Sequence, residues 1–139
     1  MTEEKQLLAD IVSLLDFGYA TEPCTIPTSN GEFRFELKTL SPLEELEARK
    51  IVTGMNLQDE QAVNLFTAIE LLARSITTLN GIPFENFPGA QGDSALTKKK
   101  FVLGRLSEKV MLPLWVAYQR VKDKATLDGT SEEAEALKK

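Results

Sequence analysis

The residues best suited to chemistry are three neighbouring glutamates in the interior of the sequence, Glu44, Glu45 and Glu47. Clustered carboxylates can hold a metal ion or act as acid and base. On a helix, however, Glu44 and Glu47 share a face while Glu45 turns about 100° away, and no nearby histidine or aspartate completes a ligand set. Negative charge also stabilises the first turn of a helix. We therefore interpret them as helix-start residues, and a small carboxylate-dependent enzyme is the last of three hypotheses.

The composition removes most other catalytic chemistry. The 139 residues include no histidine and one cysteine, Cys24, so the usual general base is missing and neither an intrachain disulfide nor a cysteine zinc site can form. Asp93 and Ser94 stand where a helix cap is needed, and no glycine-rich strand-to-helix junction could cradle a phosphate. We expect no catalytic residue, no metal and no cofactor.

The charge distribution argues against nucleic acid as a partner. The formal net charge is −5, although basic residues are concentrated around Lys98, Lys99 and Lys100. A basic run of this kind is typical of a solvated helix end or of a patch for an acidic protein partner. No apolar stretch reaches the ~20 residues that cross a bilayer, so we expect a cytoplasmic protein with no membrane contact.

A β-hairpin is the clearest local structure. Phe33, Phe35 and Leu37 alternate with charged residues, and Asn30-Gly31 is a strong turn signal, so we predict a hairpin over about residues 22–39. Ser41 then begins a helix with the spacing of a capping box. Because a two-stranded ribbon is marginally stable alone, its apolar face must pack on helices or on another chain's sheet.

Helical periodicity accounts for most of the remaining chain. The predicted class is α+β, mostly α, with an N-terminal helix, the hairpin and three to four packed helices. The third helix should end at Asn80-Gly81, and Pro113 should kink or split the last helical stretch near residues 110–112. We expect one globular domain over residues 1–127 and a flexible acidic tail over residues 128–139.

Some apolar side chains exceed what one core-facing stripe needs. On the predicted helices they are Leu65, Leu71, Leu112 and Val116. Either a partner-binding surface or a core with helices on two sides explains them.

Two segments carry a family resemblance. Residues 31–45, from the hairpin into the helix start, and residues 72–84, ending in Asn80-Gly81-Ile82-Pro83-Phe84, resemble the small tail or baseplate hub assembly chaperones of tailed bacteriophages. The resemblance implies a non-enzymatic protein that binds apolar segments of a tape-measure or baseplate hub protein in the host cytoplasm during assembly.

The resemblance also suggests which residues meet the partner. The candidate partner-binding residues are Phe33, Phe35 and Leu37, taken as anchors of the hairpin, and Leu112, Trp115 and Val116, taken as a partner contact. The second hypothesis is a permanent virion component, such as a baseplate, neck or tail-completion subunit, whose hairpin pairs with a neighbour's sheet edge. Self-association is left open.

Overall fold

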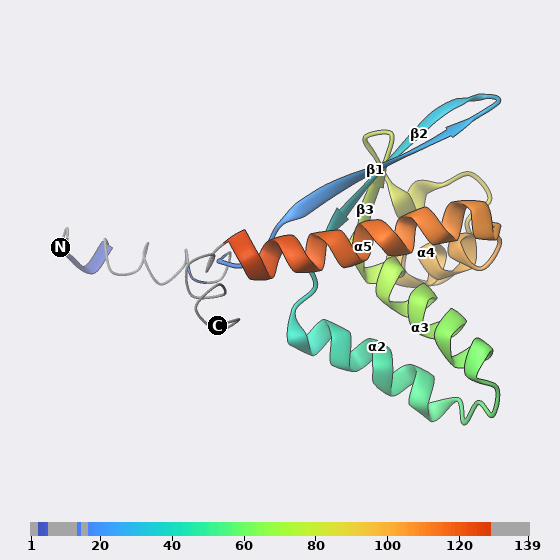
Figure 1. The fold of residues 1–139 in the computed structure, drawn as a ribbon, viewed down its shortest axis with the longest axis horizontal. Coiled ribbons are helices and arrows are strands. Elements are labelled where there is room, and N and C mark those ends of the chain that lie inside the picture. Colours follow the sequence, from blue (N-terminus) through green and yellow to red (C-terminus); the bar gives the residue numbers. More distant parts are fainter. Residues whose placement is uncertain (1–2, 6–13, 15–16, 129–139) are drawn as a thin grey trace, which may run out of the picture.

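The protein has an α+β fold that is mostly helical. The computed structural model describes residues 3–5, 14 and 17–128, so the expected N-terminal helix and most of the acidic tail lie outside the described residues. In chain order the elements are β1 (Thr21–Thr28), β2 (Gly31–Lys38), α2 (Pro42–Gly54), α3 (Glu60–Ser75), β3 (Ile76–Leu79), β4 (Ile82–Pro83), the 3₁₀ helix η1 (Phe84–Asn86), α4 (Ala95–Leu103) and α5 (Glu108–Asp128). The helices lie along one side of the sheet (Figure 1).

The predicted hairpin is confirmed, and its alternation is the basis of the core. Strands β1 and β2 pair antiparallel, with Cys24 opposite Phe35 and Glu22 opposite Leu37. Phe35 and Leu37 are buried against the helices, as a half-covered strand requires. Helix α5 runs under β1 and β2, so the ribbon gains its stability from that helix.

The sheet has four strands, two more than the sequence predicted. Helix α3 ends at Ser75 rather than at Asn80-Gly81, and the chain passes directly into β3, which pairs with β2. The residues from Ile76 to Thr78 are β-branched and favour a strand. Asn80 and Gly81 both have positive φ, of 52° and 80°, and therefore form a tight turn between β3 and β4 rather than a helix cap.

The predicted helix starts are confirmed. Ser41 and Glu44 form a full capping box at the start of α2, where each side chain accepts a hydrogen bond from the other's backbone N–H. Ser94 caps α4 by accepting from the N–H of Thr97. These local interactions fix the direction in which each helix leaves the preceding chain.

Of the two predicted effects of Pro113, a kink or a split near residues 110–112, the split is wrong. Helix α4 ends at Leu103, the link Gly104–Ser107 separates the helices, and α5 then continues through Pro113 from Glu108 to Asp128. Ser107 begins α5 by accepting hydrogen bonds from the N–H groups of Val110 and Met111. Pro113 is the sixth residue of α5, so the helix lacks the hydrogen bond that an N–H there would make to the Lys109 carbonyl, and it nevertheless continues.

Candidate docking groove

A groove lies between α2 and α5, with α3 as its floor. Helix α3 packs against both neighbours, and the three helices enclose about 830 Å³. The apolar part of its lining comes from Leu65 and Ala68 of α3 and from Met111, Leu112 and Trp115 of α5. The polar lining consists of Arg49, Gln61, Asn64, Thr67 and Glu108. We call this the docking groove.

A link between α2 and α5 lies next to the Trp115 end of the groove. The hydroxyl of Tyr118 donates to Glu45 Oε1 at 2.9 Å, and Lys122 Nζ lies 3.3 Å from the same oxygen. Burial and the Glu45 carboxylate together raise the pKa of Tyr118 above its ordinary value, so the phenol keeps its proton and remains a donor. Trp115, which lines the groove, stacks on Tyr118 with ring centroids 5.3 Å apart and so joins the groove lining to this link.

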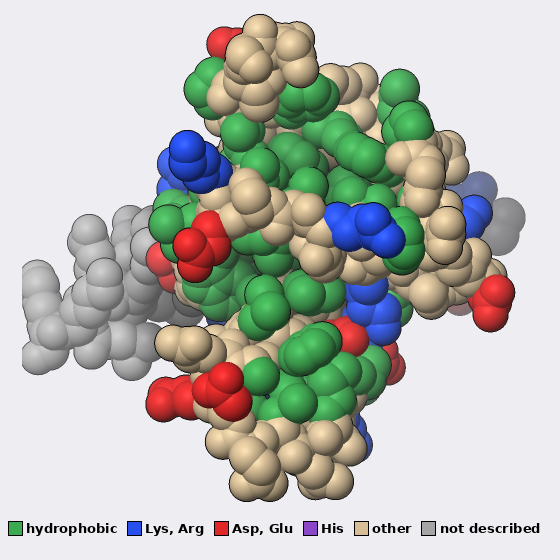
Figure 2. Space-filling view, turned by 90° about the vertical axis from the view of Figure 1, so that its right-hand side faces the viewer, with side chains coloured by type: hydrophobic (Ala, Val, Ile, Leu, Met, Phe, Trp, Pro, Cys, Tyr) green, Lys and Arg blue, Asp and Glu red, His purple; other side chains and the backbone are tan. Residues whose placement is uncertain are grey.

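The apolar lining is open to solvent where α3 and α5 diverge. Leu65 is 51% exposed and Leu112 is 65% exposed, while Met111 and Trp115 are half-buried. Seen from the right-hand side of Figure 1, hydrophobic side chains gather in the upper and lower parts of the molecule (Figure 2). Exposed leucines that line one groove together form an apolar surface of the kind that a binding partner covers.

The structure separates the six predicted partner-binding residues. Leu112 and Trp115 line the docking groove, whereas Val116 is exposed on α5 but does not line it. Phe35 and Leu37 are buried in the core, so their predicted role as anchors is compatible with the fold but they offer no surface to a partner. Phe33 lies apart from the groove, on the sheet.

Phe33 contributes to a second apolar pocket of about 450 Å³. This pocket lies at the short edge of the sheet, and its other apolar side chains are Leu79, Ile82, Pro83, Phe84, Phe87 and Pro88. Phe84 packs edge-on against both Phe35 and Phe87, so part of the pocket wall is continuous with the core. We regard this pocket as secondary because its volume is about half that of the docking groove.

Both edges of the sheet are poor templates for another strand. The backbone N–H of Arg34 donates to Asn80 Oδ1, and its carbonyl accepts from the Asn80 N–H, so the backbone groups of Arg34 point toward β3. The backbone groups of the odd-numbered residues of β2 therefore point toward β1. By the register of the pair, the backbone positions of Pro23 and Pro27 in β1 point away from the sheet. Proline has no N–H, so half of the outward donor positions in β1 are empty. Pro83 has the corresponding outward position in β4. Natural sheets use edge prolines in this way to prevent strand addition.

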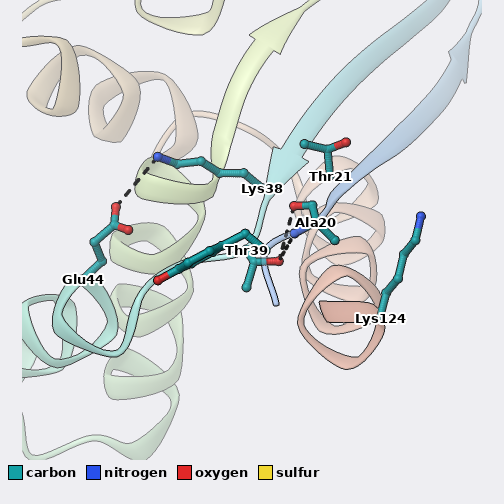
Figure 3. A pocket seen from close by; sticks show the side chains of 7 residues that line it. Ala20, Thr21, Lys38, Thr39, Glu44 and Lys124 are labelled. Atoms are coloured by element: carbon teal, nitrogen blue, oxygen red, sulfur yellow. Dashed lines mark hydrogen bonds and ion pairs between the residues drawn. The ribbon is translucent and has the colours of Figure 1, made fainter. Parts of the chain in front are cut away.

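A polar pocket at the base of the hairpin is internally satisfied (Figure 3). Lys38 Nζ is 3.9 Å from Glu44 Oε2, while Oε1 of the same carboxylate accepts from the Ser41 N–H. The Thr39 hydroxyl accepts from the Ala20 N–H at 3.0 Å. These groups join the hairpin to the start of α2, which is a structural use of the carboxylate.

The glutamate cluster of α2 does not act as a unit. Glu44 caps its helix, Glu45 bonds Tyr118 across the groove end, and Glu47 is exposed. Within the described part of the chain, no three Cys, Asp or Glu side chains come close enough to hold a metal ion.

A buried charged cluster joins α3 and α4, and sequence reasoning missed it. Glu70 is 3% exposed and lies 2.7 Å from Arg74 Nη1 and 3.2 Å from Lys100 Nζ. Lys99 donates to the Ile76 carbonyl at 2.8 Å, and burial lowers the pKa of its amine. Two lysines of the basic run are thus engaged inside the protein. The spacing of Glu70 and Arg74, four apart on a helix, was the available signal.

Similarity to known proteins does not decide the function. The chain matches no family model, curated protein or solved structure. No helix among the described residues has the length and apolar character needed to span a membrane.

Proposed function

We propose that this protein is a non-enzymatic assembly chaperone of a tailed bacteriophage, acting in the host cytoplasm on apolar segments of a tape-measure or baseplate hub protein. The observation that carries the proposal is the docking groove, where Leu65 and Leu112 stand more than half exposed on either side of an apolar lining. The resemblance of residues 31–45 and 72–84 to such chaperones supplies the kind of partner.

The energetics suit reversible binding. Burying one leucine side chain completely is worth about 1.5–3 kcal/mol, so covering Leu65, Leu112 and the open part of Trp115 supplies several kcal/mol before the costs of association. A groove of this size buries less surface than a permanent interface usually does. Reversible binding of this strength is what a chaperone needs in order to release its client.

The alternative of a permanent virion subunit joined through its hairpin has less support. It requires an open strand edge, and the outward prolines Pro23 and Pro27 remove half of the outward N–H donors of β1, while Pro83 removes one from β4. A carboxylate enzyme also has less support, because Glu44 and Glu45 are engaged in a cap and a helix-to-helix bond.

The proposal is tested by co-expression with a tape-measure protein and with a baseplate hub protein of a tailed bacteriophage. We expect the soluble fraction of one of them to rise, and the substitution Leu112→Asp to abolish the rise. Leu43→Asp is the matched control, because Leu43 is 64% exposed, lies in the first turn of α2 and does not line the groove. No gain in solubility with either protein, or an equal loss in both variants, would refute the proposal.

Mass spectrometry of purified particles separates the chaperone from the virion subunit. A chaperone should be absent from mature particles, whereas a fixed copy number in them would favour the structural alternative.

A further inference from the structure

The docking groove has opposite charges at its two ends. Glu108 is the first residue of α5 and lines the groove at the start of that helix. Arg49 of α2 lines the groove nearer its Trp115 end, where its positive charge acts on the Tyr118 hydroxyl. Ten residues of α5 separate Glu108 from Tyr118, which corresponds to about 15 Å along a helix.

Both end charges are available to a partner. Arg49 and Glu108 are exposed, and neither forms an ion pair with another residue in the described ranges. Between them the lining is apolar apart from the amides Gln61 and Asn64 and the Thr67 hydroxyl. The groove therefore combines an apolar centre with a cation at one end and an anion at the other.

We propose that the docking groove binds an amphipathic helix that places an acidic side chain at Arg49 and a basic side chain at Glu108. This inference rests on the proposed function and specifies the segment that the client supplies. A helix satisfies its own backbone hydrogen bonds, so it can lie on a surface made of side chains, whereas an extended segment would need the strand edges that the prolines close. Three helical turns, about 16 Å, match the length of α5 between Glu108 and Tyr118.

The probes are three synthetic helical peptides with the same leucine stripe. The first carries glutamates at one end and lysines at the other, the second glutamates at both ends, and the third lysines at both ends. Trp115 is the single tryptophan of the chain and lines the groove, so its fluorescence reports binding directly. We expect the mixed peptide to bind about fivefold more tightly than either other peptide at low salt.

Charge reversal in the protein should change this order. In Arg49→Glu the groove has two anionic ends, so the lysine peptide should bind best; in Glu108→Lys the glutamate peptide should bind best. The matched control is Lys50→Glu, which makes the same charge change on the next residue of α2, outside the groove lining, and should leave the mixed peptide preferred.

Several outcomes would overturn the inference. If the lysine peptide binds wild type best, attraction to the net charge of −5 explains binding and the end charges do not select the partner. An unchanged order in Arg49→Glu, or no change in Trp115 fluorescence with any peptide, refutes the charged-helix model. A dimer that Leu112→Asp dissociates would identify a second copy as the occupant. Any of these results could be obtained while the proposed function still holds. The proposed function holds if co-expression raises the solubility of the client and Leu112→Asp abolishes that rise.

Discussion

Replacing Glu70 with glutamine should destabilise the protein more than any other single carboxylate-to-amide change among the described residues. Glu70 lies between Arg74 Nη1 at 2.7 Å and Lys100 Nζ at 3.2 Å, and all three groups come from the packed surfaces of α3 and α4. Glutamine keeps the shape and one acceptor but removes the negative charge. The two cations then remain close together without a counterion.

The expected cost follows from the burial of the three side chains. Removing one partner of a buried ion pair typically costs 3–5 kcal/mol, because the other charge stays desolvated. The Arg74 side chain is 8% exposed and bears this penalty, whereas Lys100 is 28% exposed and can turn toward water. Glutamine also still accepts a hydrogen bond from Arg74. We therefore expect the low end of the range, about 3 kcal/mol.

Urea unfolding at neutral pH, followed by circular dichroism, measures this loss. With a slope of about 2 kcal/mol per molar, 3 kcal/mol lowers the midpoint by about 1.5 M. The matched control is Glu36→Gln, since the Arg34–Glu36 pair is exposed and should contribute less than about 1 kcal/mol. Equal losses in the two variants would refute the reasoning that burial, and not charge pairing alone, determines the cost.

Three further predictions concern the helix link, the second turn and the sheet edge. Tyr118→Phe should cost about 1–2 kcal/mol at pH 7 by losing the bond to Glu45. The wild-type protein should lose stability above pH 10, because the raised pKa of Tyr118 keeps the folded form protonated while the unfolded phenol ionises, and Tyr118→Phe should remove this loss. Urea titrations of both proteins at pH 7 and 10.5 would check the two effects. An equal change in stability between these pH values in wild type and variant would contradict the second effect. Gly81→Ala should lower stability by about 1 kcal/mol in thermal melts, because φ at this position is +80°, a backbone conformation that an L side chain disfavours. The loss should be no larger, because nothing lies within 4 Å of the added Cβ. Replacing Pro23 and Pro27 with threonine should restore two outward N–H groups and increase self-association in light scattering, and unchanged scattering would contradict the edge argument.

Local signals predicted the local structure well. The alternation around Phe35 and the Ser41–Glu44 capping box involve residues within a few positions of each other, and both are confirmed. The same reasoning failed at Ile76 and Pro113. Residues 76–79 continue the apolar spacing of a helix, and only pairing with β2 makes them a strand, with Leu37 opposite Ile76.

Proline position also has meaning only in context. A proline in the middle of a helical pattern predicts a break, but α5 runs from Glu108 through Pro113 and lacks only the hydrogen bond that the proline cannot donate. The chain breaks instead at Gly104–Ser107. That start depends on where α4 ends, which the apolar periodicity across both helices concealed.

The sequence by itself determined that this chain folds as a mostly helical α+β protein, but it left open whether the extra apolar side chains of its helices belong to a surface or to the core. The fold class depends on composition, periodicity and caps, which act over a few residues. Of the four candidates, Leu71 is fully buried in the core, whereas Leu65, Leu112 and Val116 are exposed. Tertiary structure decided which of those side chains are exposed together. Leu65 and Leu112 are 47 positions apart in the numbering and meet across one groove, while Phe35 and Leu37 are withdrawn into the core. The same long-range packing of α2 and α5 against α3 brings Arg49 and Glu108 into the lining of that one groove.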